Sequence, residues 1–219
     1  LPAAPRVLDL GCGTGRQTLT LASQLDGEIV AVDNHRPSLD CLAAQLQSSP
    51  PRAAVHPVEA DLHDLPDMLG PAANEPFDLI WAEGSLYIVG LAPALSAIHP
   101  LLHPEGCLAF TELTWLTAEP SDAARAFWAA AYAAIQTAAA NRTLMRNAGF
   151  DCIGDFVLPE ASWWDGYYRP IEERLGRLRD EHADVPELLE VIAATQAEID
   201  LHRAHASEYG YVFFIAQKA

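Results

Sequence analysis

Basic side chains are scarce in this sequence, which has 13 Lys and Arg against 30 Asp and Glu and a formal net charge of −17. Its single lysine is Lys218. A chain this acidic repels the phosphate groups of nucleic acids and of anionic membrane surfaces. The composition therefore argues against a nucleic-acid partner and favours a small molecule.

Close cysteine pairs and long apolar runs are also missing. The four cysteines are scattered along the sequence, which fits neither a disulfide framework nor a zinc ribbon. No stretch reaches the ~20 apolar residues of a membrane helix, and the first residues lack the basic and apolar regions of a signal peptide. We therefore expect a cytoplasmic protein without membrane insertion, whose length of 219 residues suffices for a core without disulfides.

Short apolar runs alternate with segments of helical period, a pattern typical of parallel strands joined by helices. The expected strands are residues 7–10, 28–33, 53–59, 77–82, 106–113, 150–158 and 209–217. The expected helices are 14–25, 37–47, 91–99 and 121–139, followed by a helical segment over 163–207 that is broken at Pro170 and Pro186. We expect one α/β domain over 1–219, with a cofactor-binding half over 1–118 and a helical cap inserted over 160–208.

Three alternating glycines, Gly11, Gly13 and Gly15, follow the first expected strand. Such a turn brings the backbone close to a nucleotide-like ligand because no Cβ intervenes. A dinucleotide fingerprint has its third glycine at the position that Arg16 occupies here. Asp9 adds a carboxylate where a pyrophosphate would need positive charge. The turn therefore favours a cationic ligand over NAD.

The segment from Asp9 to Gly15 resembles motif I of class I S-adenosylmethionine-dependent methyltransferases. The resemblance covers most of residues 6–113 and the last expected strand. It implies a Rossmann-like, mostly parallel seven-stranded sheet with an antiparallel last strand. Residues 81–87, 111–115, 158–160 and 209–214 are most similar to a small-molecule subgroup related to the ubiquinone/menaquinone biosynthesis and sterol enzymes.

The resemblance also implies the cofactor, S-adenosyl-L-methionine, and its product, S-adenosyl-L-homocysteine. In that family the glycine turn wraps the methionine part, a carboxylate after the second strand binds the ribose, and an acidic side chain after the third meets adenine. Asp33 and Asp61 match the last two positions. The whole expected cofactor set is Asp9, Gly11, Cys12, Gly13, Gly15, Arg16, Gln17, Asp33, Asn34, Asp61 and Leu62. Alternatively, these aspartates cap helices or lie on solvated turns.

Methyl transfer from a sulfonium is an in-line displacement with an activated donor, so the protein mainly aligns the reactants and excludes water. If the acceptor carries a proton, Glu83 and Tyr87 lie in the right region to remove it, and they are the predicted catalytic residues. The predicted substrate-binding residues are Trp115, Trp163, Trp164 and Tyr168. The alternative roles are a hydrogen bond near the cofactor for Glu83 and plain core packing for the aromatic side chains.

His202 and His205 have helical spacing, but no matching set of carboxylates accompanies them. We therefore expect a solvated helix face there and no required metal. A small-molecule acceptor and a homodimer are the expected partners. Two other functions stay open: a nicotinamide-dependent oxidoreductase on a Rossmann sheet, and a non-catalytic cofactor-binding module.

Overall fold

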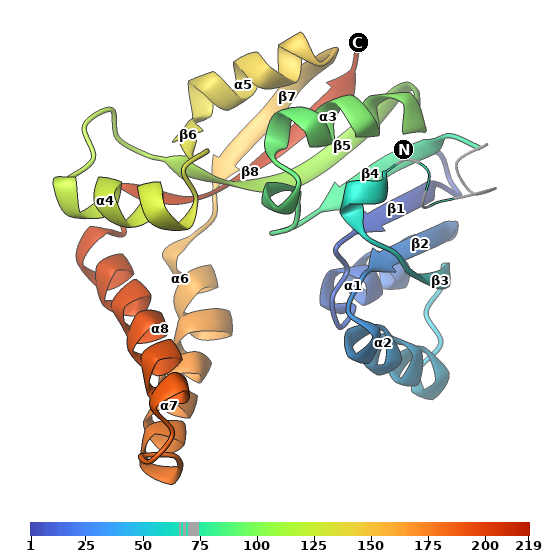
Figure 1. Ribbon diagram of the computed structural model, residues 1–219. Coiled ribbons are helices and arrows are strands. Elements are labelled where there is room, and N and C mark those ends of the chain that lie inside the picture. Colours follow the sequence, from blue (N-terminus) through green and yellow to red (C-terminus); the bar gives the residue numbers. More distant parts are fainter. Residues whose placement is uncertain (66, 68, 70–74) are drawn as a thin grey trace. The chain divides into compact units, whose positions relative to one another are not determined.

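The computed structural model describes residues 1–65, 67, 69 and 75–219 (Figure 1). The chain divides into two compact units. Unit 1 comprises Leu1–Glu112, Ala139–Phe156 and Val212–Ala219, and unit 2 comprises Leu113–Ala138 and Val157–Tyr211. The domain boundaries at 118, 160 and 208 stay a prediction.

Parallel strands make up most of the sheet. Within the described residues, seven strands lie in the order β3-β2-β1-β4-β5-β8-β7, and an eighth, β6, pairs with β5. The strands are β1 (Arg6–Leu10), β2 (Glu28–Asp33), β3 (Ala54–Glu59), β4 (Phe77–Ala82), β5 (Leu102–Trp115), β6 (Gln136–Thr137), β7 (Phe150–Val157) and β8 (Tyr209–Lys218). The pairs β1–β2, β2–β3, β1–β4 and β4–β5 are parallel.

The last strand runs against its neighbour β5. At one end of β8 the Lys218 side chain donates a hydrogen bond to the Leu102 carbonyl. At the other end the Leu116 amide donates to the Glu208 carbonyl. Residues late in β8 therefore lie beside residues early in β5, which is the antiparallel arrangement. The predicted Rossmann-like sheet is confirmed, with the two-residue strand β6 as an addition.

Helices cover both faces of the sheet in unit 1, which explains why its central strands β1, β2 and β4 are mostly apolar and buried. Figure 1 shows α1 (Arg16–Gln24) and α2 (Arg36–Ser48) on one face and α3 (Leu91–Ile98) and α5 (Ala138–Asn147) on the other. Among the described residues of unit 1, short 3-10 helices follow strands or helices at η1 (Leu62–Asp64), η3 (Leu86–Ile88) and η4 (His99–Leu101). The first helix begins at Arg16 rather than at residue 14, because Gly15 has the left-handed conformation that ends the glycine turn.

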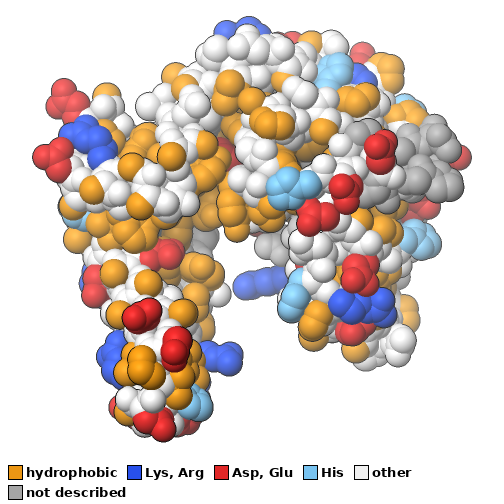
Figure 2. Space-filling view, in the orientation of Figure 1, with side chains coloured by type: hydrophobic (Ala, Val, Ile, Leu, Met, Phe, Trp, Pro, Cys, Tyr) orange, Lys and Arg blue, Asp and Glu red, His pale blue; other side chains and the backbone are white. Residues whose placement is uncertain are grey.

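Unit 2 is mainly helical and packs around aromatic side chains. Its helices are α4 (Asp122–Ala131), α6 (Glu160–Trp163), the π-helix η5 (Trp164–Tyr168), α7 (Arg169–Glu181) and α8 (Pro186–His205). Figure 2 shows acidic and basic side chains interspersed along the surface of the pair α7–α8. None of the helices in the described part of the chain is long and apolar enough to cross a membrane.

Two expectations for this region were wrong. A single helix over 121–139 does not form: α4 ends at Ala131, and β6 then pairs in parallel with Thr114 and Trp115 of β5. Strand pairing there overrides the helix propensity of the alanine-rich sequence. Pro170 does not break the helical segment either, because it lies in the first turn of α7, where a missing N–H is tolerated. The break at Pro186 is confirmed as the start of α8.

Candidate functional site

The glycine turn of unit 1 connects β1 to α1 and is fixed to β2 by backbone hydrogen bonds. The amides of Gly11 and Cys12 both donate to the Val32 carbonyl, at 2.8 and 2.9 Å. Gly15 N donates to the Cys12 carbonyl at 2.9 Å. The φ angles of Gly11, Gly13 and Gly15 are 75°, 53° and 86°, in the region that favours glycine. The chain therefore reverses direction within five residues.

The three glycines differ in what surrounds their missing side chains. A Cβ on Gly11 would lie 2.5 Å from Ser85 Cβ, and one on Gly15 would lie 2.4 Å from Leu42 Cδ1. A Cβ on Gly13 would meet no described atom within 4 Å. Gly11 and Gly15 are thus required for packing, whereas Gly13 presents bare backbone to open space.

Asp9, at the end of β1, is a buried carboxyl group with 2% of its surface exposed. Burial raises the pKa of Asp9 to about 6. The hydrogen bond that Thr18 Oγ1 donates to Asp9 Oδ2 at 2.6 Å acts in the opposite direction and lowers this pKa. The negative charges of Glu83 and Asp33 add to the rise in pKa. These three acidic groups therefore lie close enough to interact. Thr18 was not among the predicted residues, although it lies on the first turns of the helix that follows the glycines.

Asp33 ends β2 and contacts the glycine turn directly. Gly13 N donates to Asp33 Oδ2 at 2.8 Å, and His35 N donates to Oδ1 at 2.8 Å. A carboxylate oxygen has two lone pairs, so each oxygen can accept one further hydrogen bond. The structure therefore places a fixed, half-buried acceptor beside the open glycine.

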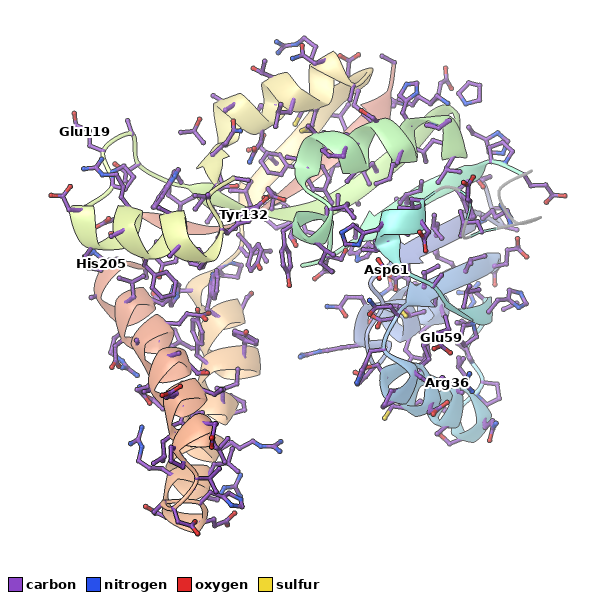
Figure 3. All side chains as sticks on the ribbon, in the orientation of Figure 1. Arg36, Glu59, Asp61, Glu119, Tyr132 and His205 are labelled. Atoms are coloured by element: carbon purple, nitrogen blue, oxygen red, sulfur yellow. The ribbon has the colours of Figure 1, made fainter. Side chains whose placement is uncertain are left out.

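Asp61 follows β3 and is labelled in Figure 3. Its Oδ1 accepts hydrogen bonds from the backbone and ring nitrogens of His63 at 2.9 and 2.8 Å, and its Oδ2 accepts one from Asn34 Nδ2 at 3.3 Å. These bonds lower the pKa of Asp61. Asp61 caps η1, as the alternative interpretation expected, while Asn34 joins it to the end of β2. Leu62 is buried beside it.

Glu83 follows β4, and two side chains hold it. Trp81 Nε1 donates to Glu83 Oε1 at 2.9 Å, and Gln17 Nε2 donates to Oε2 at 3.2 Å. The structure thus joins a residue predicted to bind cofactor, Gln17, to one predicted to be catalytic. Tyr87 lies nearby in sequence on η3, with 48% of its surface exposed. Arg16 is an exposed residue at the start of α1.

The donor set fits a cationic nucleoside better than a pyrophosphate. Among the described residues, no arginine or lysine forms an ion pair with Asp9, Asp33 or Glu83. Burial raises the pKa of the Cys12 thiol to about 12, so Cys12 is neutral and unsuited to nucleophilic chemistry. A ligand with a positive charge and free hydroxyl groups, such as S-adenosylmethionine, matches these carboxylates and the bare backbone of Gly13.

In unit 2, the predicted substrate-binding residues share one hydrophobic cluster. Trp163 and Tyr168 are buried and stack with ring centroids 5.4 Å apart, and Trp115 meets the edge of Tyr209 at 6.3 Å. Tyr168 donates a hydrogen bond to Glu198 Oε1, and Trp164 donates one to Glu160 Oε1. Their packing role is established, and their role in binding a substrate stays a prediction.

The expectation that His202 lies on a solvated helix face was wrong. His202 has 1% of its surface exposed, and its ring stacks on Trp163 at a centroid distance of 4.5 Å. The buried residues Ile192 and Ile199 of α8 lie on the same helix face as His202, because Ile199 follows Ile192 by seven positions and His202 follows it by ten. That spacing was the available signal. His205, which is labelled in Figure 3, is partly exposed. Its ring contacts Glu208 Oε1 at 2.8 Å.

Comparison with known proteins agrees with this geometry. Residues 7–106, which contain the glycine turn, β2, β3 and β4, match a family of methyltransferase domains. This match and the methyltransferase relatives below support a class I S-adenosylmethionine-dependent methyltransferase. The family predicted from the sequence is thereby confirmed.

Two curated relatives illustrate the range of this family. The chain is 35% identical to a malonyl-(acyl-carrier protein) O-methyltransferase of Pseudescherichia vulneris over 108 residues, which are 49% of this chain and 38% of the relative. It is 36% identical to a trans-aconitate 2-methyltransferase of Paracidovorax citrulli over 186 residues, which are 78% of this chain and 64% of the relative. The chain therefore spans less than two thirds of the length of each of these methyltransferases.

A solved structure shows the same fold. It is a methyltransferase from Geobacter sulfurreducens in complex with S-adenosyl-L-homocysteine, with a TM-score of 0.81 and 20% sequence identity. The match covers 100% of this chain and 86% of that protein. The methyltransferase fold thus accommodates the whole chain.

Proposed function

We propose that this protein transfers a methyl group from S-adenosyl-L-methionine to a small-molecule acceptor and releases S-adenosyl-L-homocysteine. The observation that carries the proposal is the hydrogen bond between Gly13 N and Asp33 Oδ2, which fixes a carboxylate beside the open side of the glycine turn. Methyltransferase relatives on small and carrier-bound acids support it. A small-molecule acceptor also suits the acidic composition.

Each carboxylate of unit 1 would contact a different part of the cofactor. Asp33 would accept hydrogen bonds from the ribose hydroxyls with its remaining lone pairs, and Asp61 would accept one from the adenine amino group. Asp9 and Glu83 would make the surroundings negative, which favours the positively charged end of the cofactor. Gly11, Gly13 and the backbone around them would line the path of its methionine part.

The bound cofactor supplies an already activated methyl group, so the chain contributes alignment and exclusion of water. Glu83 is our proposed proton acceptor for an acceptor hydroxyl or amine. The hydrogen bonds from Trp81 Nε1 and Gln17 Nε2 fix the direction of its carboxylate. Tyr87, with its exposed position on η3, is the second proposed catalytic residue.

A non-catalytic cofactor-binding module is the remaining alternative, because a fold alone does not establish catalysis. A homodimer, the absence of a nucleic-acid partner and a cytoplasmic location belong to the same proposal. The proposal of an enzyme is tested by incubating the protein with methyl-labelled S-adenosylmethionine and a metabolite extract. Label should appear in a small-molecule fraction. Cofactor binding without any labelled product would favour the module.

The role of Asp33 is tested by calorimetric titration of Asp33→Ala with S-adenosylhomocysteine. Loss of two charge-assisted hydrogen bonds should weaken binding by about 1.5–3 kcal/mol, which corresponds to roughly 10- to 150-fold. Asp40→Ala is the matched control, because Asp40 is an exposed carboxylate on α2 that pairs with Arg36. Equal affinities of the two folded variants would remove Asp33 from the binding site.

A further inference from the structure

Unit 2, all of whose residues are described, contains a cavity of about 250 Å³ that is partly open to solvent. Its walls are mostly apolar or aromatic. They are formed by Leu116, Val157, Leu158, Glu160, Trp163, His202, Ala206, Ser207, Tyr209 and Gly210. An apolar cavity of about 150 Å³ can hold benzene, so this volume suits one substituted ring.

His202 in this wall is a buried polar group that lacks a partner. Its ring is 1% exposed, and neither Nδ1 nor Nε2 has a hydrogen-bond partner among the described residues. Buried polar side chains are almost always hydrogen-bonded, because leaving one unpaired is unfavourable. The missing partner therefore points to a molecule that enters the cavity.

Aromatic rings surround the imidazole. Trp163 stacks on it at 4.5 Å, Tyr168 lies at 5.1 Å, and Tyr209 meets it nearly edge-on at 5.6 Å. Burial lowers the pKa of His202, so the ring is neutral at pH 7 and offers one donor and one acceptor. An uncharged ligand suits such walls, because an ion would lose its hydration there.

Glu160 is the one carboxylate among the cavity-lining residues that the structure describes. It is exposed, and its Oε1 already accepts a hydrogen bond from Trp164 Nε1. Glu160 therefore gives the cavity a polar edge rather than a buried counter-ion for a cationic ligand.

From this arrangement we propose that the unit 2 cavity binds an uncharged aromatic ring with a hydroxyl group, the chemistry of a phenol. The ring would pack against the apolar walls, and its hydroxyl would hydrogen-bond to His202. The proposal goes beyond methyl transfer and stands on unit 2 alone. Its test needs no methyl donor, so its failure is separate from that of the proposed function.

The first experiment compares phenol, benzene and benzylamine as probes of the full chain, by ligand-observed NMR titration at pH 7. Phenol should bind roughly tenfold more tightly than benzene, because only phenol pairs with His202. Equal affinities of phenol and benzene, or no binding of phenol, would overturn the proposal. Tighter binding of benzylamine would overturn it too, in favour of a cation site.

The second experiment changes the cavity itself. His202→Phe keeps a flat ring but removes both nitrogens, so the roughly tenfold preference for phenol over benzene should vanish. Gly210→Ala fills part of the space, because its Cβ would lie 3.4 Å from Leu116 Cδ1 and 3.9 Å from Trp163 Nε1. This variant should weaken phenol and benzene alike, even if His202→Phe does not fold. Unchanged affinities in Gly210→Ala would place the probe elsewhere and contradict the proposal.

Discussion

Asp9 in unit 1 and His202 in unit 2 are both titratable side chains that folding buries, with 2% and 1% of their surfaces exposed. Asp9 accepts a hydrogen bond from Thr18 and lies among other acidic groups. His202 has no hydrogen-bond partner in the described part of the chain and lies among aromatic rings. Unit 1 thus presents charge on a fixed backbone, whereas unit 2 presents an open hydrogen-bonding position inside apolar walls.

This contrast separates two ways of building a binding site. In unit 1 the site is formed by the backbone of the glycine turn. The amides of Gly11 and Cys12 and the carboxylate of Asp33 form the hydrogen bonds that fix this turn. In unit 2 the binding position is formed by side chains, because apolar and aromatic side chains make up most of the cavity walls. The first kind of site depends on conformation and the second on volume, so different substitutions should damage them.

The largest effect should come from the glycine turn of unit 1. Gly11→Ala forces a left-handed alanine and a clash with Ser85, which together should lower the free energy of unfolding by about 2–5 kcal/mol. Gly13→Ala meets open space and should lower it by only about 1–2 kcal/mol. Urea denaturation of both variants measures the difference. Equal losses would show that Gly13 is as tightly packed as Gly11.

A smaller effect should follow from the charge of Asp9. Its pKa is raised from 3.8 to about 6, so the folded protein keeps the proton while the unfolded chain loses it between these pH values. The protein should therefore lose up to about 3 kcal/mol of stability as the pH rises from 4 to 6. Asp9→Asn should lack this loss while keeping an acceptor for Thr18. Urea denaturation at each pH measures it.

Asp61→Asn is the matched control for that experiment. The pKa of Asp61 is lowered, so its ionised form stabilises the folded state above pH 3.8, and this contribution is lost as the pH falls through the folded pKa. The contribution of Asp61 to the free energy of unfolding should therefore rise with pH, whereas that of Asp9 falls. The same pH profile for both variants would contradict the assignment of burial as the cause at Asp9.

The smallest effects should distinguish the two buried groups directly. Thr18→Val removes the partner of Asp9 and should destabilise the protein by about 1–3 kcal/mol. His202→Phe removes two unpaired nitrogens and should stabilise it by about 1–3 kcal/mol. Thermal unfolding measures both shifts. A loss of stability in His202→Phe would indicate that the imidazole has a partner in the folded protein.

Much of unit 1 could be predicted because its signals are local. The strands Glu28–Asp33 and Phe77–Ala82 match their expected bounds, since apolar runs end there at polar or glycine-containing turns. Asp9 and Asp33 lie at the carboxyl ends of β1 and β2, and Asp61 follows β3. Parallel strands bring their carboxyl ends to one edge of the sheet. The fold and the placement of these carboxylates therefore followed from the sequence, while their contacts with a ligand stay a prediction.

The rest depended on contacts between distant residues. The hydrogen bond from Gln17 to Glu83 joins positions 66 residues apart, and Ser85 Oγ donates to the Leu10 carbonyl across 75. No local pattern specifies such pairs. The orientation of His202 likewise required the packing of α8 on Trp163, which the mixed polarity of that helix does not reveal. Alanine repeats misled the prediction at 121–139 because they allow a helix without requiring one.

The division of the chain has a consequence for protein engineering. The backbone passes between the two units at residues 112–113, 138–139, 156–157 and 211–212, and three of these crossings lie inside β5, β7 and β8. Neither unit can be excised as one continuous fragment. A chimaera that exchanges unit 2 for that of another methyltransferase needs two separate inserts, spliced within strands whose alternation of inward and outward side chains must be kept.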